Sequence, residues 1–171
     1  MARLRQLWDG IKMRRLNDAG LLSTKDSTIY PLARRAKPVE AEPALPGLPA
    51  NWEAIETPFI VRHDGYFYLI TSWDLCCRGL KSTYKTMVGR SKSIIGPYVD
   101  ADGRELADGG GTELPLANSR WLGPGGGSVY LDSQNQSLIV FHAYDSKTGK
   151  PSMQLSSIDW TGGWPHADLE Q

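Results

Sequence analysis

Residues 58–70 read PFIVRHDGYFYLI, two runs of aromatic and β-branched residues separated by the turn His63-Asp64-Gly65. Such residues favour strands, and Asp-Gly between two such runs is a strong signal for a β-hairpin. After a loop the chain continues through a third run, Lys85–Ser91, to Gly96-Pro97-Tyr98. The stretch therefore predicts an antiparallel meander of about three or four strands.

A similar pattern recurs later in the chain. Residues 127–142 read GSVYLDSQNQSLIVFH, two strand-like runs around a polar turn, and Met153–Ile158 forms a further run. Repetition of a meander is the sequence signature of a β-propeller, in which each meander forms one blade. A β-sandwich with regular turns is the alternative that the pattern leaves open.

Three Gly- and Pro-rich stretches mark connections between these runs. Asp9-Gly10 predicts a hairpin turn between two short strands. Residues 31–52 are dense in Pro and predict a long surface loop. Residues 123–127, GPGGG, lack the Lys-Ser/Thr ending of a phosphate-binding loop and precede a strand, so we interpret them as a turn.

Composition excludes several classes of function. The 171 residues carry 19 Lys and Arg against 19 Asp and Glu, without a block of like charges, which argues against a nucleic-acid or membrane partner. No apolar run reaches membrane-spanning length, and Met1–Arg15 lacks the apolar core of a signal peptide. The 6 Trp residues hint at sugar-stacking surfaces, although a single Trp is more often part of a core.

Three motifs carry a resemblance to a known family: residues 55–60 (IETPFI), 72–79 (SWDLCCRG) and 142–145 (HAYD). With these motifs the chain resembles endo-1,5-α-L-arabinanases of glycoside hydrolase family 43. The resemblance implies an all-β fold, namely the last two and a half blades of a five-bladed β-propeller. Residues 1–30 would end one blade, 31–52 would form the Pro-rich loop, 53–105 the blade with the candidate acid, and 106–171 the last blade.

The resemblance also implies a reaction. Family members hydrolyse arabinan, the side chains of pectin, with inversion, and use an Asp base, a Glu acid and a second Asp that tunes the acid. Glu56 falls at the position of the acid, and both Asp residues would belong to a missing N-terminal propeller segment upstream of Met1. Arabinan or arabino-oligosaccharide is the implied partner, and the implied location is extracellular. Taken alone, a Glu beside Thr-Pro at the start of a strand is usually a solvated edge residue.

A loop beside Glu56 is the implied substrate-binding element. The resemblance places on it Trp73, Asp74, Cys76, Cys77 and Arg78. Trp73 is the candidate for stacking on a sugar. The alternative from the residues themselves is that Trp73 packs under its own blade and that Cys76 and Cys77 are small buried hydrophobes.

His142 is the candidate metal ligand. The resemblance places it at the propeller centre, where it would bind a hydrated calcium ion. Calcium prefers about six to eight oxygen ligands, so a single imidazole would hold it only with a shell of waters. A His at the end of an apolar strand is more often hydrogen-bonded within a core.

Two other functions stay open on this sequence. One is a propeller remnant that binds arabinan without cleaving it, which the absence of two catalytic carboxylates favours. The other is a related activity, arabinofuranosidase or xylosidase.

Overall fold

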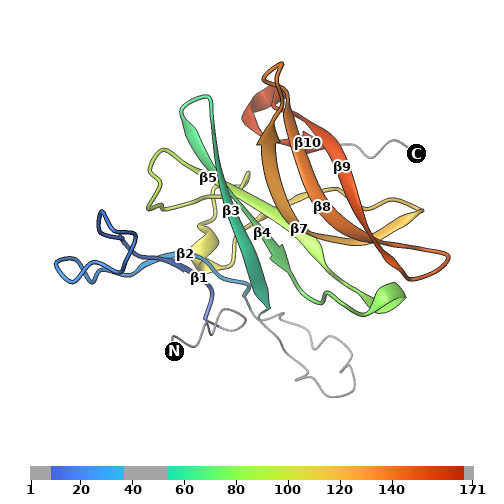
Figure 1. Ribbon diagram of the computed structural model, residues 1–171, viewed down its shortest axis with the longest axis horizontal. Helices are drawn as coiled ribbons and strands as arrows, with labels where there is room; N and C mark the ends of the chain where they lie inside the picture. The colour runs from blue at the N-terminus through green and yellow to red at the C-terminus, as the bar shows by residue number, and fades with distance from the viewer. Residues whose placement is uncertain (1–8, 37–53, 168–171) are drawn as a thin grey trace.

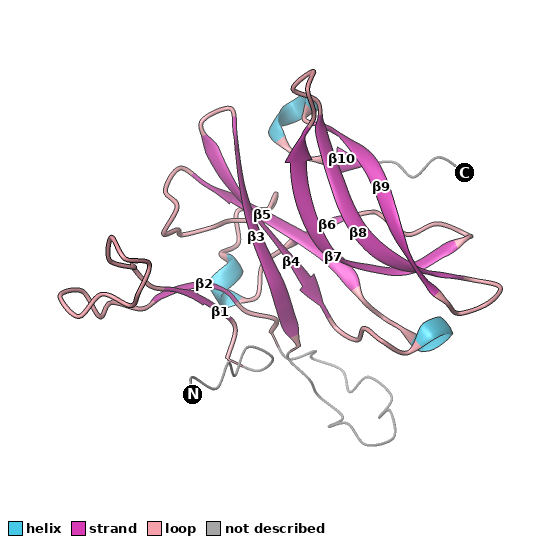
Figure 2. Cartoon of the chain, viewed as in Figure 1, coloured by secondary structure: helices cyan, strands magenta, loops and turns pink. Residues whose placement is uncertain are grey.

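The computed structural model describes residues 9–36 and 54–167 (Figure 1). Within these residues the fold consists of antiparallel strands with three short 3₁₀ turns, η1 (Gly79–Lys81), η2 (Leu106–Asp108) and η3 (Thr161–Gly163). The strands form one two-stranded sheet and two four-stranded sheets (Figure 2). No helix of the described part is long and apolar enough to cross a membrane.

The central sheet comprises β3 (Ile55–His63), β4 (Tyr66–Trp73), β5 (Lys85–Ser91) and β6 (Thr112–Leu114), paired in chain order. The predicted hairpin is confirmed, since His63 pairs with Tyr66 across Asp64 and Gly65. Both turn residues have positive φ, 44° and 72°, as the tight turns of two-residue hairpins require. The predicted strand at Lys85–Ser91 is also confirmed as β5.

The C-terminal sheet comprises β7 (Trp121–Leu131), β8 (Ser137–Asp145), β9 (Pro151–Asp159) and β10 (His166–Ala167), again in chain order. The predicted turn at residues 123–127 is wrong, because these residues lie within β7. The register between β7 and β8 shifts on both sides of Gly125. Glycines in a strand mark such bulges and close backbone approaches more often than they end the strand.

The two-stranded sheet pairs β1 (Ile11–Met13) with β2 (Tyr30–Ala33). β1 follows directly on Gly10, and the strand expected before Asp9 lies outside the described residues. β2 occupies the start of the expected Pro-rich loop, and the rest of that loop, from residue 37, also lies outside the described residues. The central sheet continues to Leu114, past the expected blade boundary at residue 105, because β6 pairs with β5.

The three sheets follow one another in space as in sequence (Figure 1). The central sheet is apolar on both faces: Tyr68 and Ile70 pack with Ile139 and other residues of the C-terminal sheet, whereas Leu69 packs in a second core with residues of the β1–β2 hairpin. Each such buried side chain contributes roughly 1.5–3 kcal/mol. Consecutive antiparallel meanders packed face to face are the arrangement of propeller blades, so the structure is a partial β-propeller.

Candidate active site

Glu56 lies near the start of β3 and pairs with Ser72 of β4. Paired residues of neighbouring strands share a face, and Ser72 shares the face of Ile70, which packs toward the C-terminal sheet. Glu56 is therefore placed at the junction of the two four-stranded sheets. There its Oε1 accepts a hydrogen bond of 2.6 Å from the hydroxyl of Tyr84.

The backbone directly after Glu56 is held in an unusual conformation. Thr57 has a φ of 52°, which is rare for a β-branched residue and costs on the order of 1–3 kcal/mol. The register of β3 against β4 shifts between Glu56 and Phe59 at the same place. The Thr57 hydroxyl donates to Ser72 Oγ at 2.7 Å, and the Gly126 N–H donates to the same oxygen at 2.9 Å. These bonds hold the bulge and thereby fix where Glu56 points.

Tyr84 is a permanent hydrogen-bond donor to Glu56. Burial raises the pKa of the Tyr84 phenol well above its usual value, and the hydrogen bond to Glu56 acts in the same direction. The phenol consequently keeps its proton at any physiological pH. Since it is buried at the junction of the sheets, it also holds the carboxylate in one position.

The side chain of His142, on β8, extends to the junction where Tyr84 and Glu56 meet. It can do so because the neighbouring residues of β7 are glycines, which have no side chains. His142 pairs with Gly125, and the rings of Tyr84 and His142 stack with centroids 5.6 Å apart. A Cβ on Gly125 would overlap the Tyr84 ring, and one on Gly126 would lie 3.2 Å from His142 Nδ1. The glycines thus let two side chains from different sheets meet. On its other side His142 borders a hollow of about 300 Å³ that Gly126 and Met153 also line.

The imidazole of His142 is linked to the loop after β4. Its Nε2 lies 3.4 Å from the Tyr144 hydroxyl, which accepts a hydrogen bond of 2.7 Å from the Cys77 N–H. Burial lowers the pKa of His142, whereas the negative charge of Glu56 acts in the opposite direction. The ring is therefore neutral at neutral pH, and one of its two nitrogens carries no proton.

Trp73 and Asp74 do not meet Glu56. The Trp73 side chain is 7% exposed and belongs to the core on the opposite face of the central sheet, under the guanidinium of Arg35 at 5.0 Å. Asp74 is buried and pairs with Arg35 at 2.9 Å and with Lys85 at 3.3 Å. Trp73 and Asp74 thus anchor the start of the loop through core packing and ion pairs.

The remaining loop residues are Cys76, Cys77 and Arg78. Cys76 and Cys77 are joined by a disulfide, and Cys77 has a φ of 67°. Arg78 is exposed ahead of η1, with its N–H bonded to Ser82 Oγ at 3.1 Å. The hydrogen bond from Cys77 to Tyr144 is what connects this loop to the C-terminal sheet.

The donor set around His142 does not by itself form a calcium site. Across residues 9–36 and 54–167, no three side chains of His, Cys, Asp or Glu converge in a way that could hold a metal ion. One imidazole and one phenol fall short of the oxygen-rich shell that calcium prefers. A calcium ion here would be held through water.

Four polar residues of the site were not singled out from the sequence: Thr57, Ser72, Tyr84 and Tyr144. Thr57 and Ser72 look like ordinary strand residues, and nothing in the sequence indicates that their hydroxyls bond each other. The run Gly125-Gly126 is the sequence feature that could have indicated a ring packed against this strand, as the Tyr84 ring is. Glycines inside a strand mark the close approach of another group.

The chain matches the model of Glycosyl hydrolases family 43 over residues 4–165. It therefore belongs to this family. It is similar to the Extracellular endo-alpha-(1->5)-L-arabinanase 1 of Bacillus subtilis, with 39% identity over 92% of this chain and 43% of that protein. It is also similar to the Extracellular exo-alpha-(1->5)-L-arabinofuranosidase ArbA of Cellvibrio japonicus, with 36% identity over 96% of this chain and 46% of that protein.

The same likeness holds for solved structures. The α-L-arabinanase of Cellvibrio cellulosa matches 95% of this chain and 50% of its own length, with a TM-score of 0.81 and 36% identity. That protein has also been solved in complex with arabinohexaose. The chain spans about half the length of these relatives.

Proposed function

We propose that this chain is the acid-bearing part of a glycosidase that hydrolyses α-1,5-linked arabinan with inversion. The observation that carries the proposal is the position of Glu56, held by Tyr84 beside His142 at the junction of two sheets. The relatives named as arabinanases support the choice of substrate. Their names as extracellular proteins support an extracellular location.

In this proposal Glu56 protonates the leaving oxygen. Inverting hydrolysis needs a second carboxylate about 6.5–9.5 Å away to activate a water. We assign that base, and the Asp that tunes the acid, to a segment corresponding to the part of the relatives that this chain does not span. Tyr84 occupies Oε1 of Glu56, so Oε2 is the oxygen that we assign to the transferred proton.

The loop after β4 is the proposed substrate contact. Cys76, Cys77 and Arg78 would contact sugar directly, and the bond from the Cys77 N–H to Tyr144, a neighbour of His142, supports this assignment. Trp73 and Asp74 would act indirectly, by holding these residues in place. Trp73 is buried in a core, and Asp74 forms ion pairs with Arg35 and Lys85. Replacing either support should raise KM more than it lowers kcat.

An assay on linear debranched arabinan and on an aryl arabinoside tests the function. The chain is assayed alone and after assembly with the part of the Bacillus subtilis arabinanase that it does not span. Oligosaccharides are expected from arabinan, and Glu56→Gln should lower their rate roughly 100-fold or more. Glu113→Gln, at an exposed residue of the edge strand β6, is the control and should leave the rate unchanged.

Other outcomes favour the rival functions. Release of arabinose alone would favour an exo-acting enzyme, which the likeness to the exo-arabinofuranosidase supports. Retention on immobilised arabinan without any product would favour a protein that binds arabinan without cleaving it.

The calcium ion near His142 is a further part of the proposal. The neutral imidazole supports it, since a metal ligand must offer an unprotonated nitrogen. Added Ca²⁺ should raise the melting temperature of the chain, and His142→Ala should abolish that rise. If chelation leaves the melting temperature unchanged, calcium is not bound here.

A further inference from the structure

Ser72 lies at the centre of the hydrogen bonds beside Glu56. It is 1% exposed, and its Oγ accepts one bond of 2.7 Å from the Thr57 hydroxyl and another of 2.9 Å from the Gly126 N–H. A serine hydroxyl has two acceptor lone pairs and one proton to donate. Since both lone pairs of Ser72 are occupied, its remaining capacity is the donation of its own proton.

The phenol of Tyr84 is the group that this proton reaches. Hydrogen bonds with the hydroxyls of Ser72 and Thr57 act against burial on Tyr84 by lowering its pKa, as bonds donated to the phenol oxygen do. The Tyr84 hydroxyl in turn donates to Glu56 Oε1 at 2.6 Å. The bonds therefore form one chain that begins at the Gly126 N–H and ends at the carboxyl group.

The direction of the bonds in this chain is fixed at its start. A backbone N–H donates and cannot accept, so the Ser72 proton has to point away from Gly126. Each hydroxyl that accepts a bond on one side donates on the other, and the Tyr84 proton consequently points at Glu56. Oε1 is thus held as an acceptor in both charge states of the carboxyl group, which leaves Oε2 for the acidic proton.

We propose that Ser72 is a positioning residue that keeps the acidic proton of Glu56 on Oε2, the oxygen assigned to protonate the leaving group. Because Ser72 is buried, it acts through Tyr84 and does not touch substrate. Without the Ser72 hydroxyl, the Tyr84 oxygen could accept a bond from a protonated Oε1, and the proton would then lie on the wrong side of the carboxyl group. The use of the proton rests on the proposed function, whereas the place of the proton does not.

Infrared difference spectroscopy of the whole chain tests the place of the proton without any hydrolysis. Spectra at acidic minus neutral pH contain the carbonyl band of protonated Glu56, which is identified by its loss in Glu56→Gln. A hydrogen bond to a carbonyl oxygen lowers its stretching frequency, so the bond from Tyr84 to Oε1 places the wild-type band low. Ser72→Ala should shift the band upward, toward its position in Tyr84→Phe.

Two comparisons separate this role from general damage to the core. Ser91→Ala removes another buried serine of the same sheet, together with its bond from the Ser93 N–H, and should leave the band in place. In a Tyr84→Phe background, Ser72→Ala should add no further shift, because the hydroxyl through which it acts is gone. Ser72→Cys keeps a side chain of similar shape with a weaker donor, and it should give a smaller upward shift if the alanine variant does not fold.

Kinetics supply the second measurement. After assembly with the part of the Bacillus subtilis arabinanase that this chain does not span, Ser72→Ala should lower kcat on linear arabinan roughly tenfold and leave KM unchanged. The proposal is overturned if the folded Ser72 variant keeps the wild-type band, if the two substitutions shift the band additively, or if KM rises while kcat stays the same. A shifted band in an assembly that hydrolyses no arabinan would count against the proposed function only.

Discussion

Gly125 decides how closely Tyr84 approaches the C-terminal sheet, and Tyr84 in turn fixes Glu56. A side chain at residue 125 would overlap the Tyr84 ring, so the ring and the glycine fit one space. The hydrogen bond between Tyr84 and Glu56 depends on that fit. The geometry of the site thus depends on Gly125, a residue without a side chain.

Gly125→Ala should therefore destabilise the chain by roughly 1–3 kcal/mol, the usual effect of overpacking a buried contact. Urea unfolding measures this change. In a Tyr84→Ala background the same substitution should cost much less, whereas in a Tyr84→Phe background it should cost as much, because the ring remains. Equal costs in all three backgrounds would mean that the ring is not the obstacle.

His142 makes stability depend on pH in the mildly acidic range. Its pKa in the folded chain lies below the ordinary value of 6.5, chiefly because burial disfavours the charged ring. The unfolded chain therefore binds the proton more readily, and folding free energy is lost as pH falls from about 6.5 through the folded pKa. The contribution is fully present above the unfolded pKa.

Thermal melts between pH 7.5 and pH 5 should show this loss. In His142→Gln, which keeps a polar side chain of similar size without a titrating group, the loss over that range should be smaller. A variant that loses as much stability as the wild type would show that another group is responsible.

At the scale of single elements, Asp74 links three segments. It follows β4, pairs with Lys85 at the start of β5 and pairs with Arg35 after β2. The Asp74 and Arg35 side chains are only 3% and 12% exposed, so water competes weakly for their charges. This ion pair fastens the β1–β2 hairpin to the central sheet.

Asp74→Ala should cost about 3–5 kcal/mol, because it removes the carboxylate that pairs with a largely buried guanidinium. Denaturant unfolding measures the change. Asp9→Ala is the matched control: its exposed pair with Lys12 should contribute no more than about 1 kcal/mol. If the two variants unfold alike, the buried pair does not hold the hairpin.

The elements differ in how well the sequence predicts them. The hairpin around Asp64-Gly65 and the strand Lys85–Ser91 depend on local pattern, and both are predicted correctly. The sequence predicts the later part of β7 as a strand but residues 123–127 as a turn, because the glycines there accommodate the rings of Tyr84 and His142, which come from distant parts of the chain. Likewise, Glu56 pairs with Ser72, the residue before Trp73, so Glu56 and Trp73 face opposite sides of one sheet. Only the register between β3 and β4 reveals this.

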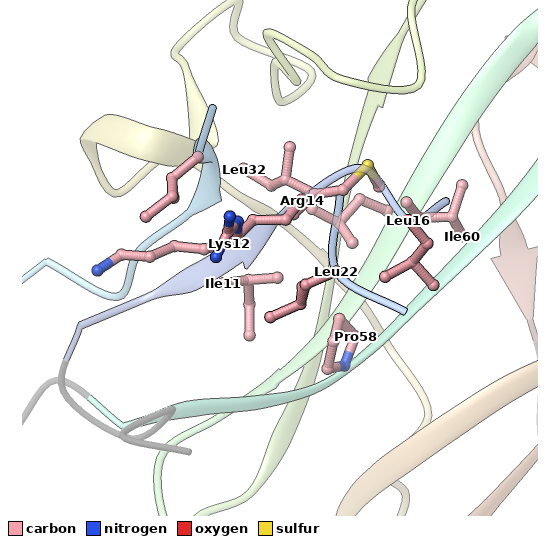
Figure 3. A pocket seen from close by; sticks show the side chains of 11 residues that line it. Ile11, Lys12, Arg14, Leu16, Leu22, Leu32, Pro58 and Ile60 are labelled. Carbon is pink, nitrogen blue, oxygen red and sulfur yellow. The ribbon is translucent and has the colours of Figure 1, made fainter. Parts of the chain in front are cut away.

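At the scale of the whole molecule, the row of sheets formed by the described residues carries apolar surface at both ends. At one end, an apolar groove of about 660 Å³ lies between the β1–β2 hairpin and the central sheet (Figure 3). At the other end, β8 buries Ile139 and Phe141 toward the central sheet, while Val140 on its opposite face lines a hollow with Met153 of β9. A strand that is apolar on both faces is typical of one buried on both sides. We expect the segment to which the catalytic base is assigned above to cover both ends.

Met153→Glu should therefore weaken assembly with the unmatched part of the Bacillus subtilis arabinanase, although Met153 is far along the chain from the β1–β2 hairpin. The side chain is 77% exposed, so the isolated chain should keep its melting temperature while the complex dissociates more readily. Isothermal titration of the wild type, Met153→Glu and the control Ile94→Glu, at another exposed apolar residue, distinguishes the cases. Weakening by Met153→Glu alone among the two would indicate a closed ring. Wild-type affinity in Met153→Glu would mean that the partner leaves the last sheet open, since a charge at an uncovered position costs almost nothing.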